Sequence, residues 1–149
     1  MKPVQLFAVR PEPGHAPGQY HYISELLAPP AIAPDMWAHM ALLGQYACAA
    51  GYLVLLEDPD SFEKGPFWLL FSADLTLLDE GARAVMYDGD ETTNLAVDGN
   101  DAVRFDWFGR RWRLQVLPKP RWYFFDMGTL FLPVWRKRWF VLKRLQRVP

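Results

Sequence analysis

Apolar residues in the first third of the chain recur at the spacing of helices, between breaks that are rich in proline. From Met36 to Ala50 they return every three or four residues, and Gly51 follows at a natural helix end. A shorter helix is expected over 20–27, because a pair of prolines follows soon after it. The sequence therefore predicts two helices in the N-terminal half.

From residue 52 onward the pattern is that of strands. Continuous apolar runs at 52–56 and 67–73 are typical of strands that are covered on both faces. The shorter runs 83–88 and 94–97 each lead into an Asp-Gly step, which favours a tight turn between strands. Together with a short strand at 3–9, these runs predict an antiparallel meander.

The segment 103–116 shows the clearest alternation. Apolar side chains alternate with polar ones before and after a turn at 108–110, so one face of the hairpin is apolar and the other is mainly Arg. This is expected of a sheet with one packed face and one face in water. Trp107 and Trp112 fall on the apolar face, so we expect them in the core rather than on a surface where bases could stack.

The C-terminal segment fits two periods. From Val134 to Arg147 a helix would gather apolar residues on one side and Lys and Arg on the other, whereas 138–142 also fits a strand, and we favour the helix. The predicted fold class is therefore α+β. It is a single globular domain over 1–149, in which an antiparallel meander sheet carries two helices from the N-terminal half and a basic amphipathic C-terminal helix or strand.

Charge is divided between the two parts of the chain. Residues 1–102 contain fifteen Asp or Glu and four Lys or Arg, which gives a charge of −11. Residues 103–149 contain two Asp and twelve Lys or Arg, which gives +10, so the net charge of the chain is −1. Five of the seven Trp also lie in the basic part. Such asymmetry bears on partners and solubility more than on the fold.

No motif names a reaction. Cys48 is the only cysteine, which excludes an internal disulfide framework and a cysteine-based zinc cluster. The loop from Asp88 begins like a calcium loop, but Thr93 stands at its obligatory glycine and Gly99 at its bidentate glutamate. We therefore predict no catalytic residue, no metal and no cofactor, and favour a protein that is not an enzyme.

The expected location is the cytoplasm. The start of the chain is interrupted before an apolar run long enough for a secretory signal, and no stretch reaches the ~18 apolar residues of a membrane-spanning helix.

The acidic loops between residues 57 and 101 are the first candidate for a functional surface. Clustered like charges on loops raise association rates and select partners of opposite charge. The sequence therefore predicts a non-enzymatic protein-binding module for a basic partner, of inhibitor, immunity (antitoxin-type) or assembly-adaptor character. The residues expected to contact that partner are Glu57, Asp58, Asp60, Glu63, Asp88, Asp90 and Glu91.

The basic part supplies the alternative, a nucleic-acid-binding protein. Arg and Lys pair with phosphates, and aromatic faces stack on bases. The same Arg residues would equally serve to neutralise the acidic loops of their own chain. Contact of Trp135 and Trp139 with an anionic membrane surface and a homo-oligomer are also left open. The nucleic-acid candidates are Arg104, Arg111, Arg113, Arg136 and Arg138.

Overall fold

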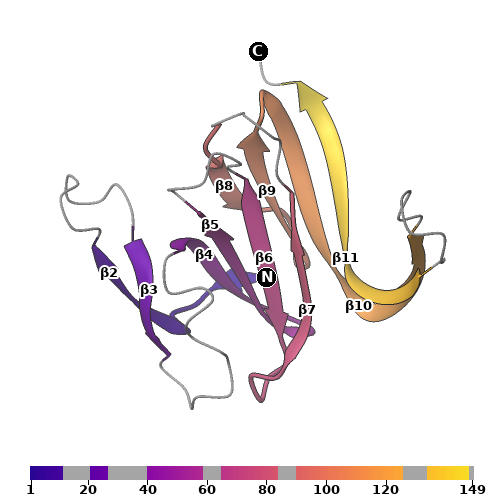
Figure 1. Ribbon diagram of the computed structural model, residues 1–149, viewed down its shortest axis with the longest axis horizontal. Coiled ribbons are helices and arrows are strands. Elements are labelled where there is room, and N and C mark those ends of the chain that lie inside the picture. Colours follow the sequence, from indigo (N-terminus) through magenta and orange to yellow (C-terminus); the bar gives the residue numbers. More distant parts are fainter. Residues whose placement is uncertain (12–20, 27–39, 59–64, 84–89, 126–133, 148–149) are drawn as a thin grey trace.

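Strands from the first half of the chain form one antiparallel sheet in the computed structural model, and strands from the second half form another (Figure 1). The structure describes residues 1–11, 21–26, 40–58, 65–83, 90–125 and 134–147. The first sheet contains β1 (Lys2–Pro3), β2 (Phe7–Pro11), β3 (His21–Leu26), β4 (Ala41–Cys48), β5 (Gly51–Glu57), β6 (Pro66–Phe71) and β7 (Leu77–Ala82). The second contains β8 (Thr93–Val97), β9 (Ala102–Trp107), β10 (Arg110–Phe125) and β11 (Val134–Arg147).

Both sheets are meanders in which strands that follow one another in sequence lie side by side. The first has the order β2-β3-β4-β5-β6-β7, with β1 added beside β4, and the second has the order β11-β10-β9-β8. β7 and β11 are edge strands of their sheets, and these two strands contact each other.

The predicted α+β class is wrong, because the described residues contain no helix. The helix expected over 36–50 is β4 from Ala41 onward, paired with β5 along its length, whereas 36–39 lie outside the described residues. The run of Ala, Leu and Met satisfies a helical period, but pairing with the apolar strand that follows overrides that local preference. Gly51 ends no helix and instead begins β5.

The two other helix predictions fail in the same way. Of the segment 20–27, the described residues His21–Leu26 form β3, which pairs with β2. The C-terminal segment, for which a strand is the alternative to the favoured helix, is the strand β11, paired with β10 from Val134 to Arg147. Its Lys and Arg suit a strand at the edge of a sheet, where charged side chains limit non-specific edge-to-edge aggregation.

The hairpin expected at 103–116 is confirmed as β9 and the first half of β10. Phe108 and Gly109 form its turn, and both have positive φ angles, of 54° and 59°, as a two-residue type I′ turn requires. The strands expected at 52–56, 67–73 and 94–97 agree with β5, β6 and β8. β7 was not predicted, and most of the strand expected at 83–88 lies outside the described residues.

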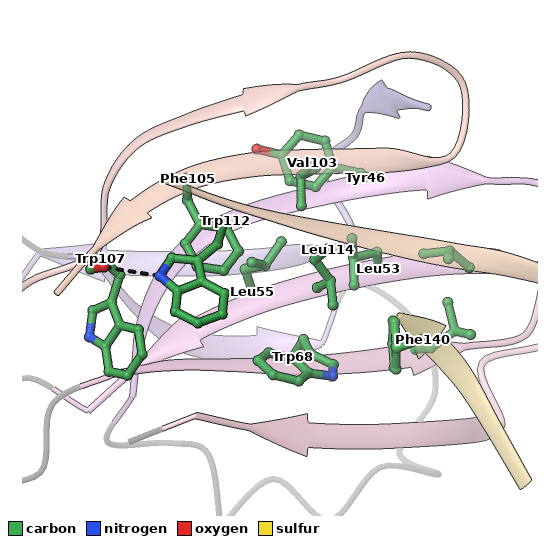
Figure 2. Packing of buried hydrophobic residues seen from close by; sticks show 12 residues of the cluster. Tyr46, Leu53, Leu55, Trp68, Val103, Phe105, Trp107, Trp112, Leu114 and Phe140 are labelled. Atoms are coloured by element: carbon green, nitrogen blue, oxygen red, sulfur yellow. Dashed lines mark hydrogen bonds between the residues drawn. The ribbon is translucent and has the colours of Figure 1, made fainter. Parts of the chain in front are cut away.

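The core lies between the two sheets (Figure 2). Leu53, Leu55 and Leu70 of the first sheet are fully buried against Phe105 and Leu114 of the second. The same cluster contains Trp107 and Trp112, which confirms that the apolar face of the hairpin packs inward. The Trp112 indole N–H donates to the carbonyl of Trp107 at 3.0 Å, which satisfies a polar group that would otherwise be costly to bury.

The first sheet is buried on its other face as well. Val54 and Leu56 of β5 and Leu69 and Phe71 of β6 form a second cluster there. Burial on both faces explains why β5 and β6 read as continuous apolar runs instead of alternating ones. The described residues include no helix that is long and apolar enough to cross a membrane.

The second half of β10 extends beyond the rest of its sheet. Pairing between β9 and β10 ends at Gln115, whereas β10 and β11 continue together to Phe125 and Val134. The resulting two-stranded ribbon curves away from the body of the molecule (Figure 1). A register shift between Val116 and Arg121, where β10 contains two prolines, marks the start of this ribbon.

Candidate functional site

Arg111, a nucleic-acid candidate, lies in a charge network of its own sheet. Its guanidinium binds Asp106 through both carboxylate oxygens, with Nε at 2.7 Å and Nη2 at 3.0 Å. The Asn94 side chain donates to the same carboxylate at 2.9 Å. The hydrogen bond from Arg111 holds the pKa of Asp106 below its usual range, because it stabilises the ionised form. This two-point geometry is the strong form of an Arg–carboxylate pair.

Arg113 is held by the loop between β8 and β9. Its Nε donates to Asp98 at 2.7 Å, its Nη2 lies 3.5 Å from Asp101, and its Nη1 donates to Gln115 at 3.1 Å. Arg104 is directly opposite Arg113 in the register of β9 and β10, and its side chain is exposed. The outer face of the second sheet thus carries Arg side chains that are largely matched by carboxylates of the same sheet.

Arg138 joins the two sheets. Its Nη1 donates to Asp79 of β7 at 2.9 Å and also to the carbonyl of Glu80. The backbone N–H of Trp139 donates to the other Asp79 oxygen at 2.8 Å. The Asp79 side chain is only 2% exposed, so its charge is stabilised by these donors in place of water. We call Asp79, Arg138 and Trp139 the inter-sheet clamp.

The Arg111–Asp106 pair predicts a dependence of stability on pH. The folded state lowers the pKa of Asp106, so this carboxylate contributes stability above the ordinary aspartate value near ~4 and loses it as the pH falls through the folded-state value. We expect Arg111→Met to be less stable than wild type at neutral pH, with a difference that shrinks below about pH 4. Thermal melts across this range would measure it.

Lys143→Met is the matched control, because Lys143 is an exposed cation of the same sheet. In this control variant, the loss of stability at acidic pH should be the same as in wild type. A gap between wild type and Arg111→Met that stays constant down to the lowest pH would contradict the assignment.

The predicted acidic surface is divided by the structure. Glu57 is 1% exposed and accepts hydrogen bonds from the Thr92 backbone N–H at 3.0 Å and the Thr92 hydroxyl at 2.7 Å, so it is a structural residue. Asp58 is half-buried. Asp90 and Glu91 are exposed and lie together just before β8. The candidates Asp60, Glu63 and Asp88, and the side chain of the basic candidate Arg136, lie outside the described residues.

Asp90 and Glu91 form one wall of a hollow of about 450 Å³, which we call the acidic hollow. The tip of the β9–β10 hairpin, with Phe108 and Arg110, also lines it. The hollow thus brings two exposed carboxylates next to an aromatic ring and a guanidinium. Sequence reasoning found the carboxylates but missed the hairpin tip beside them, because the residues are far apart along the chain.

Phe108 occupies a position that rarely holds a large side chain. Its φ of 54° lies in the left-handed region, which costs a non-glycine residue about 1–2 kcal/mol. Its ring lies 5.9 Å from the Trp107 ring, and this packing offsets part of the cost. Asparagine or glycine would adopt this left-handed conformation with less strain. The turn alone therefore does not explain the phenylalanine at this position.

Comparison with known proteins adds no family. No protein-family model, no curated protein and no solved structure matches the chain. The candidate site therefore rests on its own geometry.

The described residues contain no group of three or more His, Cys, Asp or Glu side chains that could hold a metal ion. Burial raises the pKa of the Cys48 thiol, which disfavours the reactive thiolate. The acidic hollow remains the best candidate for a contact with a partner.

Proposed function

We propose that this chain is a protein-binding module whose acidic hollow receives a basic side chain of a partner protein. The observation that carries the proposal is the exposed pair Asp90 and Glu91 in the wall of the hollow, which the strained aromatic residue Phe108 also lines. A carboxylate pair beside an aromatic ring suits Lys or Arg, because the cation gains an ion pair and a ring face together.

The pattern of internal charge pairing supports this choice. Arg111, Arg113 and Arg138 are bound to carboxylates of their own chain, so these three cations of the basic part serve the fold. Asp90, by contrast, forms no ion pair within the part of the chain that the structure describes. A protein of inhibitor, immunity or assembly-adaptor character would use such a surface without needing catalytic groups.

Reversing the charge of Asp90 tests the proposal. We expect Asp90→Lys to slow association with captured basic proteins by about tenfold at low ionic strength, because the steering attraction becomes a repulsion. Immobilised wild type and variant would be exposed to the same cell extract, and each captured protein would then be measured individually by surface plasmon resonance.

Glu80→Lys is the control, because it makes the same change of charge at another exposed carboxylate. It should retain the partners of wild type. Identical association rates for wild type and Asp90→Lys would contradict the proposal, as would capture of further copies of this chain alone.

One observation favours nucleic-acid binding as a second candidate function. Its site differs from the group of Arg residues that the sequence predicted for this role. Trp122, on the projecting ribbon, is 59% exposed, and the Lys137 ammonium lies 5.1 Å from its ring centre. Lys119 and Arg121 beside it are exposed as well. Cations around an open aromatic ring are typical of single-strand binding. A salt-dependent affinity for oligothymidylate that Trp122→Ser abolishes would favour this function.

A further inference from the structure

A second cleft lies where the edges of the two sheets diverge. Beyond the inter-sheet clamp, β7 and β11 separate and leave a cleft of about 330 Å³ between Gly81–Arg83 on one side and Phe140–Leu142 on the other. The clamp closes one end of this cleft, since Arg138 is among its lining residues. We call it the edge cleft.

Backbone groups of both edges face into the gap. The Glu80 carbonyl of β7 accepts a hydrogen bond from Arg138, and the Trp139 N–H of β11 donates to Asp79, so both groups point away from their own sheets. In β11 the residue that faces outward is Leu142, because its neighbour Val141 pairs with Gln115 of β10, whose backbone groups face β11. In β7, alternation from Glu80 gives Ala82 the same outward direction, so the two outward-facing residues are Ala82 and Leu142. Both residues line the cleft, and neither edge is paired with a further strand among the described residues.

Aromatic and aliphatic side chains form the floor of the cleft. The rings of Trp68 and Phe140 meet edge to face, with centres 6.2 Å apart, and Leu142 lies beside them. Figure 2 shows the Trp68 indole between the two sheets, on the side of the core where β11 passes. The indole lies directly against Gly81, where an added Cβ would come within 2.4 Å of its nitrogen. Glycine at this position therefore keeps Trp68 in the floor.

A cation lies at the opposite end from the clamp. Arg83 is exposed, and its guanidinium lies 4.6 Å from the centre of the Trp112 ring. It makes no ion pair within the described part of the chain. An Arg stacked on an aromatic face keeps its in-plane N–H groups available, and these match a carboxylate at two points.

We propose that the edge cleft binds an extended peptide segment of a partner protein, in which an apolar residue lies next to an acidic one. The peptide adds as a strand between β7 and β11, with its backbone paired to Ala82 and Leu142. One apolar side chain enters the floor formed by Trp68 and Phe140, and the carboxylate binds Arg83. Strand addition at an open sheet edge is a common mode of peptide recognition, in which backbone bonds give affinity and side-chain pockets give specificity.

Charge complementarity selects this occupant. The cleft presents the guanidinium of Arg83, which makes no ion pair with any of the described residues, and its other charged lining residue is Arg138, also a cation. A second copy of this chain would bring the edge of its own β11, which is rich in Lys and Arg, against these cations. The site is distinct from the acidic hollow and does not depend on the function proposed for it.

The experiment uses two short blocked peptides, one of alternating Val and Asp and one of alternating Val and Lys, titrated into the isotope-labelled full chain. We expect the Val-Asp peptide to shift the backbone amide resonances of Ala82 and Leu142 saturably. The Val-Lys peptide should bind at least about fivefold more weakly, because it places cations against Arg83.

Two variants assign the contacts. Arg83→Gln should remove the preference for the Val-Asp peptide while retaining the fold. Ala82→Pro should weaken both peptides, because it removes an N–H at an open edge where proline is tolerated. If Ala82→Pro does not fold, the response of Arg83→Gln decides alone.

Three results would overturn the proposal. The first is the absence of saturable shifts at Ala82 and Leu142 up to about 5 mM peptide, well above a 1 mM dissociation constant. The second is an unchanged preference in Arg83→Gln. The third is a concentration-dependent dimer that already protects these amides without peptide, which would show that a second copy is the occupant.

Discussion

Replacement of Asp79 by alanine is expected to lower the free energy of unfolding by about 3–5 kcal/mol. The variant removes the Asp79 carboxylate from the guanidinium of Arg138, whose side chain is 22% exposed, and from the Trp139 N–H. The loss of one partner from a buried pair costs more than the pair itself contributes, because the remaining charge stays desolvated. Urea denaturation at neutral pH measures the change.

Asp98→Ala is the matched comparison, because it also removes a carboxylate from an Arg. Asp98 is 39% exposed, and Arg113 keeps Asp101 nearby, so the expected cost is at most about 1 kcal/mol. The double variant Asp79→Leu/Arg138→Met should recover part of the loss, since no unpaired charge remains. Equal costs for Asp79→Ala and Asp98→Ala would show that the clamp contributes little.

The second large effect is expected at the turn between β4 and β5. Gly51 has a φ of 132°, and an added Cβ would lie 2.0 Å from the Phe71 carbonyl oxygen. That oxygen belongs to the backbone of the core strand β6 and cannot rotate away. We expect Gly51→Ala to cost about 3–5 kcal/mol, the sum of backbone strain and overpacking.

Gly99→Ala separates these two causes. Gly99 also has a positive φ, of 79°, but an added Cβ would have no atom within 4 Å. It should therefore cost only the strain, about 1–2 kcal/mol. Unfolding curves of the two variants give the steric part by difference, and equal midpoints would refute the clash.

Local sequence patterns predicted those elements whose periodicity was unambiguous. The alternation in β9 and β10 correctly identified the hairpin, its apolar face and the burial of Trp107 and Trp112. The run in β4 was misread, because small and aliphatic residues fit a helix and a doubly buried strand equally well. Pairing with β5 decides between them, and no local pattern reports that pairing.

Sites built from distant segments were harder to predict. Glu57 was assigned to the surface because its neighbours are acidic, yet it is buried against Thr92. Arg138 gave no sign of its partner, which is fifty-nine residues away on a strand that the sequence did not reveal. The sequence shows how many cations and anions are available, whereas the fold determines which of them pair with one another.

The division of the two sheets along the chain has a consequence for biosynthesis. Every strand of the first sheet precedes every strand of the second, so a ribosome completes β1–β7 before it makes the residues that cover them. At roughly 5–20 residues per second, the core face that carries Leu53, Leu55 and Leu70 waits several seconds for Phe105, Leu114 and Phe140. During that interval the nascent chain presents an open apolar sheet, which makes it a natural client for ribosome-associated chaperones.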